Sequence, residues 1–280
     1  MDQNRDDGVL NVQGSGESSN PGLRLPRDLQ QRLQLARVGP TGVPALLVSA
    51  ESDEPNPPMV VWLHGRTASK ELDPGRYLRL MRSGLSVCAL DLPGHGERFD
   101  ETLQHHDHVL DVILRMEDEL DAAVDEAASI LEADPARLGI GGMSAGGMVT
   151  ALRLTRPHPY SCCVLEATTG SWEDQRRRPM FINRSSEELQ AIDPLHHLDQ
   201  WRPIPLLAVH CIADQWVDWI GQCRFLDALD ALGDSPDPVQ RLLFETTGAP
   251  HEHVGFGPHS AEVKERERDF FARYLLGGLS

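Results

Sequence analysis

The chain has 280 residues, enough for one large α/β domain, and carries 26 Lys and Arg against 43 Asp and Glu, a net charge of −17. A surface this acidic repels nucleic acids and anionic membranes, so we expect neither as a general partner. The opening MDQNRDDGVLNVQG lacks the basic and apolar regions of a secretory signal, and no apolar run approaches the roughly 18 residues that span a membrane.

Residues 1–22 are rich in Asp, Asn, Gly and Ser, which predicts a disordered tail. From 23 to 280 we expect a single domain, because short apolar runs alternate with longer amphipathic stretches. The apolar runs predict strands at 45–49, 59–63, 87–90, 138–141, 162–165, 206–209 and 241–244. The amphipathic stretches predict helices at 75–83, 111–132, 145–155, 223–232 and 263–276.

Apolar runs of this kind, separated by helices, are typical of a buried parallel sheet whose strands need crossover helices. The pattern therefore predicts an α/β fold with a mostly parallel, doubly wound sheet flanked by helices. The segment 168–202 fits this rhythm poorly, because it is long and polar and contains three consecutive arginines at 176–178. We expect either a small cap between the strands at 162–165 and 206–209, or a loop with one short surface helix.

The cysteines and one histidine cluster suggest other chemistry, which the sequence does not favour. Five cysteines make an odd count, and Cys88, Cys162 and Cys211 lie in apolar runs, which indicates buried free thiols. The run HHDH at 105–108 resembles a metal site, but three ligands on one loop seldom point at one ion, so we expect a solvated loop and no metal. Reduced thiols without a secretory signal predict a cytoplasmic protein.

The stretch GMSAG at 142–146 lies between an expected strand and an expected helix. A strand-to-helix bend with a reactive serine at its apex needs small neighbours, because larger side chains would collide. Ser144 would then project from the carboxyl edge of the sheet, where such folds bind their ligands. The N–H of Ala145, in the first helical turn, would face developing negative charge. By itself the pentapeptide also fits a small-residue turn between two core elements.

A serine hydroxyl needs a base to remove its proton, and a histidine base needs an acid to fix its tautomer. Asp214 follows the strand at 206–209 and reaches the same sheet edge as the serine. Glu166, at the end of the strand at 162–165, and Asp218 are alternative acids. His251 and His253 both lie on the loop after the strand at 241–244, which can swing back over the serine.

The chain resembles the α/β-hydrolases over about residues 44–275, near the dienelactone-hydrolase-like and prolyl-oligopeptidase-like esterases. The resemblance rests on WLHGRTASKE at 62–71, DLPGHGER at 91–98, the GMSAG bend, and the loops with the candidate acid and base. It implies the chain order Ser, Asp or Glu, His. It also implies that the residue after the His-Gly pair, Arg66, supplies a second N–H to the oxyanion.

Two family patterns select between the candidates. The spacing Gly-x-x-His, counted from Gly248, places the base at His251, with His253 as the alternative. The spacing His-x-x-x-Asp-x-x-Val, which begins at residue 210, favours Asp214 over the other two acids.

The sequence thus predicts a serine hydrolase, most specifically a carboxylic-ester hydrolase that works through an acyl-enzyme. Ser144 is the expected nucleophile, His251 the base and Asp214 the acid, and Ala145 and Arg66 are the expected oxyanion donors. A serine at this position argues against dienelactone hydrolase itself and haloalkane dehalogenases. No cofactor is implied, the expected partner is a small-molecule ester, and no oligomeric state is predicted.

Other functions remain open at this stage. A thioesterase or a small peptidase would use the same triad. A non-catalytic binding module on the hydrolase fold is the third alternative, although such modules typically lose members of the triad.

Overall fold

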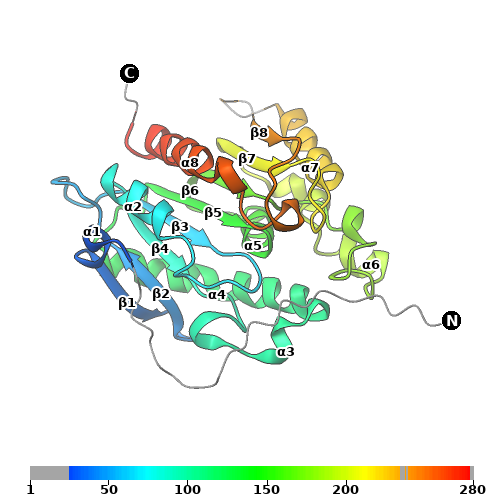
Figure 1. Ribbon diagram of the computed structural model, residues 1–280, viewed down its shortest axis with the longest axis horizontal. Coiled ribbons are helices and arrows are strands. Elements are labelled where there is room, and N and C mark those ends of the chain that lie inside the picture. Colours follow the sequence, from blue (N-terminus) through cyan, green and yellow to red (C-terminus); the bar gives the residue numbers. More distant parts are fainter. Residues whose placement is uncertain (1–24, 234–236, 238, 278–280) are drawn as a thin grey trace.

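The computed structural model describes residues 25–233, 237 and 239–277 (Figure 1). The tail predicted at 1–22 lies outside the described residues. None of the helices in the described ranges combines the length and apolar character that crossing a bilayer requires.

A central sheet of eight strands organises the described part of the chain, in the order β1-β2-β4-β3-β5-β6-β7-β8. β2 runs antiparallel to both of its neighbours, β1 and β4, and the other pairs are parallel, so the sheet is mostly parallel, as the sequence predicts. The strands are β1 (Leu33–Val38), β2 (Val43–Val48), β3 (Met59–Leu63), β4 (Ser86–Leu90), β5 (Leu138–Met143), β6 (Tyr160–Glu166), β7 (Leu206–Cys211) and β8 (Gln240–Phe244).

Helices cover both faces of this sheet, which confirms the predicted α/β class. Figure 1 shows α4 and α5 below the sheet, whereas α2 and α8 lie above it. The helices are α1 (Arg27–Gln30), α2 (Pro74–Arg82), α3 (Glu101–Gln104), α4 (Val109–Ile130), α5 (Ala145–Arg153), α6 (Ser186–Gln190), α7 (Trp219–Leu232) and α8 (Ser260–Leu275).

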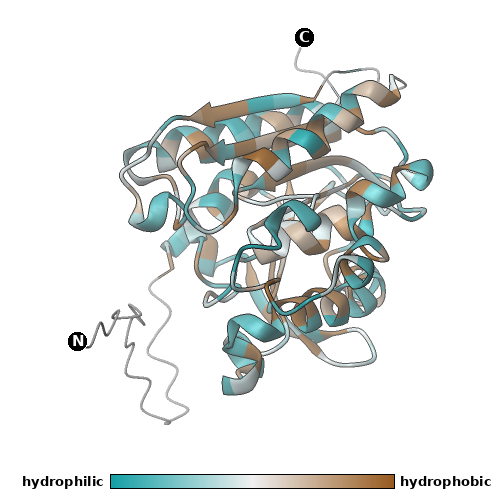
Figure 2. Cartoon of the chain, turned by 90° about the vertical axis from the view of Figure 1, so that its right-hand side faces the viewer, coloured by the Kyte–Doolittle hydropathy of each residue, from teal (hydrophilic) through white to brown (hydrophobic). Residues whose placement is uncertain are grey.

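The central strand β3 shows how one run of apolar residues serves two cores. Val61 and Leu63 pack in the cluster on the side of α4, whereas Val60 and Trp62 pack in the cluster on the side of α2 and α8. Successive side chains on a strand point to opposite faces, so a strand covered on both sides must be apolar throughout. Figure 2 shows the resulting hydrophobic strands between helices with more polar outer faces.

The segment 168–202 contains short helical turns rather than a layer of its own. They are a 3-10 turn at Glu173–Gln175, the helix α6 and a 3-10 stretch at Pro194–Gln200. Trp172 and Phe181 are buried beneath it and stack with ring centroids 6.1 Å apart. Buried aromatic side chains therefore fix the segment against the carboxyl end of the sheet.

Candidate active site

A tight bend joins β5 to α5, with Ser144 at its apex in a backbone conformation of φ 51° and ψ −117°. A non-glycine residue with positive φ is strained, at a cost of about 1–3 kcal/mol. The flanking glycines are required by space: a Cβ on Gly146 would lie 2.2 Å from the carbonyl oxygen of Leu63, and one on Gly142 would lie 2.5 Å from the carbonyl carbon of Gly146. The expected strand, bend and helix are all present.

Ser144, His253 and Asp214 form one continuous chain of hydrogen bonds. His253 Nε2 lies 2.9 Å from Ser144 Oγ, and His253 Nδ1 lies 2.7 Å from Asp214 Oδ2. All three side chains are buried, and three separate loops at the carboxyl edge of the sheet contribute them. An imidazole held between a hydroxyl and a carboxylate can move one proton to and from the hydroxyl.

The second oxygen of the Asp214 carboxylate is held by the backbone. Asp214 Oδ1 accepts hydrogen bonds of 2.8 Å from the N–H groups of Trp216 and Val217. These bonds fix the carboxylate after β7, so that its other oxygen faces the imidazole. Asp214 Oδ2 in turn holds the imidazole of His253 with Nδ1 protonated, which leaves Nε2 free to accept from the serine.

The sequence placed His251 between the serine and the aspartate, but the structure places His253 there. The physical reason is the backbone of the loop after β8, where His251 and Glu252 both have positive φ, 55° and 51°. These two left-handed residues add a reversal that counting from the preceding glycine could not anticipate. His251 is exposed and stacks on Trp216, with ring centroids 4.9 Å apart.

Glu252 ties this strained loop together, a role that the sequence analysis missed. Its Oε2 accepts hydrogen bonds from Thr247 Oγ1 at 2.7 Å and from Gly248 N at 3.1 Å, and the Thr247 N–H donates to the same oxygen. The thiol of Cys211, at the end of β7, lies 3.5 Å away. Hydrogen bonds from Thr247 lower the pKa of the Glu252 carboxyl. In the sequence, the sign of this role is the Thr247-Gly248 pair that precedes Glu252.

The expected oxyanion donors lie on either side of the serine. Ala145 is the first residue of α5, so its N–H has no acceptor carbonyl within the helix. Gly65, just before Arg66, packs so close to the serine that an added Cβ would lie 3.4 Å from Ser144 Cβ. Within the described residues, neither the Ala145 nor the Arg66 N–H donates a hydrogen bond.

His64 orients the peptide that links Gly65 to Arg66. Its Nε2 accepts from the Leu92 N–H at 3.1 Å, so its Nδ1 carries the proton and donates to the Gly65 carbonyl at 2.7 Å. Burial lowers the pKa of His64 to about 3, so the ring stays neutral. Because the C=O and N–H of a trans peptide lie in one plane and point in opposite directions, this contact turns the Arg66 N–H away from His64.

The other candidate acids lie elsewhere. The Glu166 side chain forms an ion pair with Arg76 at 2.5 Å, and only its backbone carbonyl contacts Ser144, by accepting from the serine N–H at 2.9 Å. Asp218 caps α7 by accepting from Ile220 N at 3.1 Å. Neither carboxylate contacts His253.

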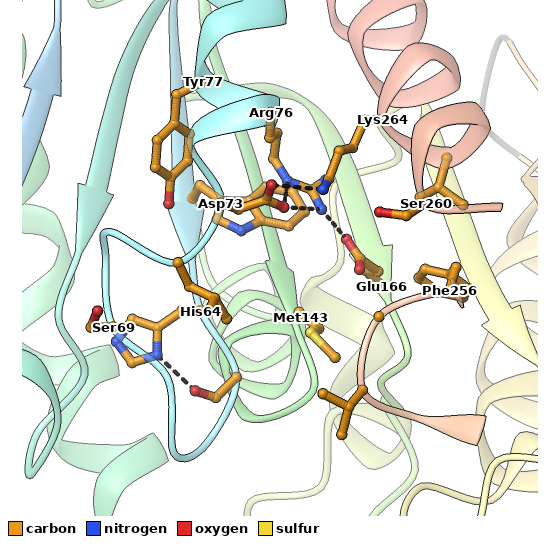
Figure 3. Close-up of a pocket in the computed structure, with 16 residues that line it drawn as sticks. His64, Ser69, Asp73, Arg76, Tyr77, Met143, Glu166, Phe256, Ser260 and Lys264 are labelled. Carbon is orange, nitrogen blue, oxygen red and sulfur yellow. Dashed lines mark hydrogen bonds and ion pairs between the residues drawn. The ribbon is translucent and has the colours of Figure 1, made fainter. Parts of the chain in front are cut away.

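A cavity of about 240 Å³ opens beside the serine (Figure 3). It lies between the loop after β3, helix α2, the start of α8 and the loop that follows His253. Gly65, Met143 and Val254, each close in sequence to a site residue, line the end near the serine.

His105, His106 and Asp107 are the candidate metal ligands in the described ranges, with ligand atoms within 4.8 Å of one another. The three residues are consecutive and at least partly exposed, and Asn183 donates a 3.1 Å hydrogen bond to the Asp107 carboxylate. They lie on the loop before α4.

Comparison with known proteins finds relatives among hydrolases. The profile of the prolyl oligopeptidase family matches residues 79–278. Esterase YjfP of Escherichia coli strain K12 is 28% identical over 193 residues, which cover 63% of this chain and 76% of that protein.

Two solved structures show the same fold at low sequence identity. The acylaminoacyl peptidase of Pyrococcus horikoshii aligns with a TM-score of 0.69 and 18% identity, over 89% of this chain and 43% of that chain. The Pyrococcus furiosus esterase Pf2001 aligns with a TM-score of 0.60 and 19% identity, over 89% of this chain and 95% of that chain. The present chain therefore spans less than half of the peptidase and nearly all of that esterase.

Proposed function

This chain belongs to the prolyl oligopeptidase family of serine hydrolases with the α/β-hydrolase fold, and we propose that it hydrolyses carboxylic esters through a Ser144–His253–Asp214 triad. The observation that carries the proposal is the pair of hydrogen bonds from His253, 2.9 Å to the serine hydroxyl and 2.7 Å to the aspartate carboxylate.

In the first half of the reaction, Ser144 Oγ attacks the ester carbonyl carbon while His253 Nε2 takes the hydroxyl proton. Asp214 stabilises the imidazolium through the Nδ1–H bond. The negative charge on the carbonyl oxygen is received by the N–H groups of Ala145 and Arg66, and a donor of this kind is typically worth about 3 kcal/mol of barrier. When this intermediate collapses, the alcohol leaves, and His253 Nε2 donates the proton to the oxygen of the leaving alcohol.

In the second half, water attacks the acyl-serine and His253 again acts as the base. The second tetrahedral intermediate uses the same two N–H donors. Its collapse frees the carboxylic acid and returns the proton to Ser144, so one imidazole serves both steps. The mechanism uses no cofactor, and the buried free thiols support the predicted cytoplasmic location.

An ester is preferred as the substrate because the curated relative is an esterase and the chain spans nearly all of a second esterase. A matched substrate panel tests this choice: p-nitrophenyl butyrate, the butyryl thioester of thiophenol and butyryl p-nitroanilide share one acyl group. We expect the highest kcat/KM for the ester and no turnover by Ser144→Ala. A higher value for the thioester or the anilide would replace the ester by that substrate class, and no turnover of any would refute the proposed activity.

A further inference from the structure

We propose that the cavity beside Ser144 is a subsite for one arm of the ester, a compact group that is apolar along its length and ends in a neutral hydrogen-bond acceptor such as a ketone or amide carbonyl. The inference rests on the proposed function, since it names the class of ester that the site would take.

The cavity has the position and size of a substrate subsite. It begins at Gly65 and Met143, the neighbours of the oxyanion loop and of the serine, and extends to Lys264 on α8 (Figure 3). Its volume of about 240 Å³ has room for about eight water-sized atoms. A chain of five or six heavy atoms beyond the scissile bond would therefore fill it.

The walls along this path are mostly apolar. Trp62, Tyr77 and Val263 line the cavity from the sheet, α2 and α8, and each is almost fully buried. Phe256 lies across from them on the loop that follows His253. A hydrocarbon stem gains from leaving water in such a passage, whereas a polar stem would lose its hydration without replacement.

The far end is ionic, and most of its charges are already paired with one another. Arg76 is buried over the ring of Trp62, with its guanidinium carbon 3.7 Å from the centroid, and it forms ion pairs with three carboxylates. They are Asp73 at 3.0 Å, Glu166 at 2.5 Å and Glu267. A ligand carboxylate would be repelled, because three acids here face only two cations, Arg76 and Lys264. A ligand cation would meet those two cations themselves, because the unpartnered oxygen of Glu267 is not part of the cavity lining.

Two donors at this end are available for a neutral acceptor. Within the described residues, the only contact of the Lys264 ammonium is with Asp73 Oδ1 at 2.9 Å, so two of its three protons are unused. Ser260, one turn earlier on α8, lines the same cavity, and its hydroxyl has no partner among the described residues. Figure 3 shows both side chains on the side of the cavity formed by α8. A carbonyl oxygen placed here would accept from both.

Matched pairs of esters test this assignment. On the acyl side, p-nitrophenyl 5-oxohexanoate is compared with p-nitrophenyl 5-methylhexanoate, in which a methyl group replaces the ketone oxygen. On the alcohol side, 4-oxopentyl acetate is compared with 4-methylpentyl acetate in the same way. We expect one pair to show about a tenfold higher kcat/KM for the ketone, the size of a charge-assisted hydrogen bond.

Variants locate the effect in the cavity. Lys264→Met should reduce the ketone preference from about tenfold to about threefold, because the methionine keeps the stem and only the neutral Ser260 hydroxyl can still donate. Arg268→Met, one turn further along α8 and outside the cavity, is the matched control and should keep the preference. Ser260→Leu should fill the cavity and lower kcat/KM for the long ester relative to p-nitrophenyl acetate by about tenfold.

The outcomes separate the two levels of the proposal. If the wild type hydrolyses p-nitrophenyl acetate but shows no ketone preference in either pair, the subsite is refuted while the esterase stands. A ketone preference that stays near tenfold in Lys264→Met refutes it as well. If no ester is hydrolysed, the proposed function fails and the subsite assignment falls with it.

Discussion

Glu252 accepts a 2.7 Å hydrogen bond from the hydroxyl of Thr247, across the base of the loop that delivers His253 to the serine. The two residues before His253 have left-handed backbones, and this carboxylate is what holds that conformation against its strain. The proposed base is thus positioned by an acid that never touches it.

Replacement of that acid should uncouple the base from the nucleophile. We predict that Glu252→Ala lowers kcat by about tenfold with little change in KM, because a 1 Å displacement of a catalytic group can cost that much or more. Glu262→Ala, at an exposed position of α8, is the matched control and should have wild-type kinetics. Wild-type kcat in Glu252→Ala would show that the loop keeps its shape without the carboxylate.

The two histidines of this loop should differ sharply in importance. His253→Ala should lower kcat by about 10³-fold or more, because it removes the general base. His251→Ala should retain kcat within about threefold, since it loses only an exposed stack on Trp216. Steady-state kinetics with one ester decide the matter, and the reverse ranking would restore the assignment that the sequence spacing favoured.

Most of the framework follows from local signals. The run 59–63 is apolar at each position and forms β3 with the predicted bounds, because a strand buried on both faces has no other composition available. Ser144 could be identified as the candidate nucleophile because the bend leaves no room for side chains on its glycine neighbours, which pack against β3 and α5. Asp214 could be identified as the candidate acid because it lies three residues after the buried strand β7.

The missed features depend on geometry that composition does not encode. β1 is half-exposed and reads LQLARV, so it has neither an apolar run nor a clear alternation, and its pairing with β2 defines it. The choice of His253 over His251 depends on two non-glycine residues that adopt left-handed backbones, which local preferences disfavour. Side-chain hydrogen bonds to Glu252 and backbone hydrogen bonds, such as the one from Gln215 N to the His251 carbonyl at 3.0 Å, hold that turn.

The bend itself should tolerate no side chain at Gly146. Gly146→Ala places a Cβ 2.2 Å from the Leu63 carbonyl oxygen and should destabilise the fold by about 1–3 kcal/mol or more. Gly75→Ala on α2 meets only the end of the Arg79 side chain at 3.5 Å and should stabilise by about 0.5–1 kcal/mol. Urea unfolding of the two variants checks both signs, and a Gly146→Ala protein of wild-type stability would contradict the packing described for the bend.

Acid should destabilise the protein partly through His64. In the unfolded chain this imidazole takes up a proton below about pH 6.5, but in the folded chain only near pH 3, because it is buried. The unfolded state therefore binds more protons between these values, and stability falls as the pH falls. The full benefit of a neutral His64 is present above pH 6.5.

The measurement is the free energy of unfolding between pH 4 and pH 6, compared with His64→Asn. The free energy of unfolding of the variant should fall less steeply with falling pH, by up to the contribution of one proton, about 1.4 kcal/mol per pH unit. Parallel pH profiles for the two proteins would show that His64 is not held neutral in the folded state.

Labelling with a fluorophosphonate, followed by mass spectrometry of the intact and digested protein, tests the central claim most directly. The account predicts one label per chain, on Ser144, that forms at nearly the wild-type rate in His251→Ala, far more slowly in His253→Ala and not at all in Ser144→Ala. A label on any other residue, or undiminished labelling after His253→Ala, would contradict it.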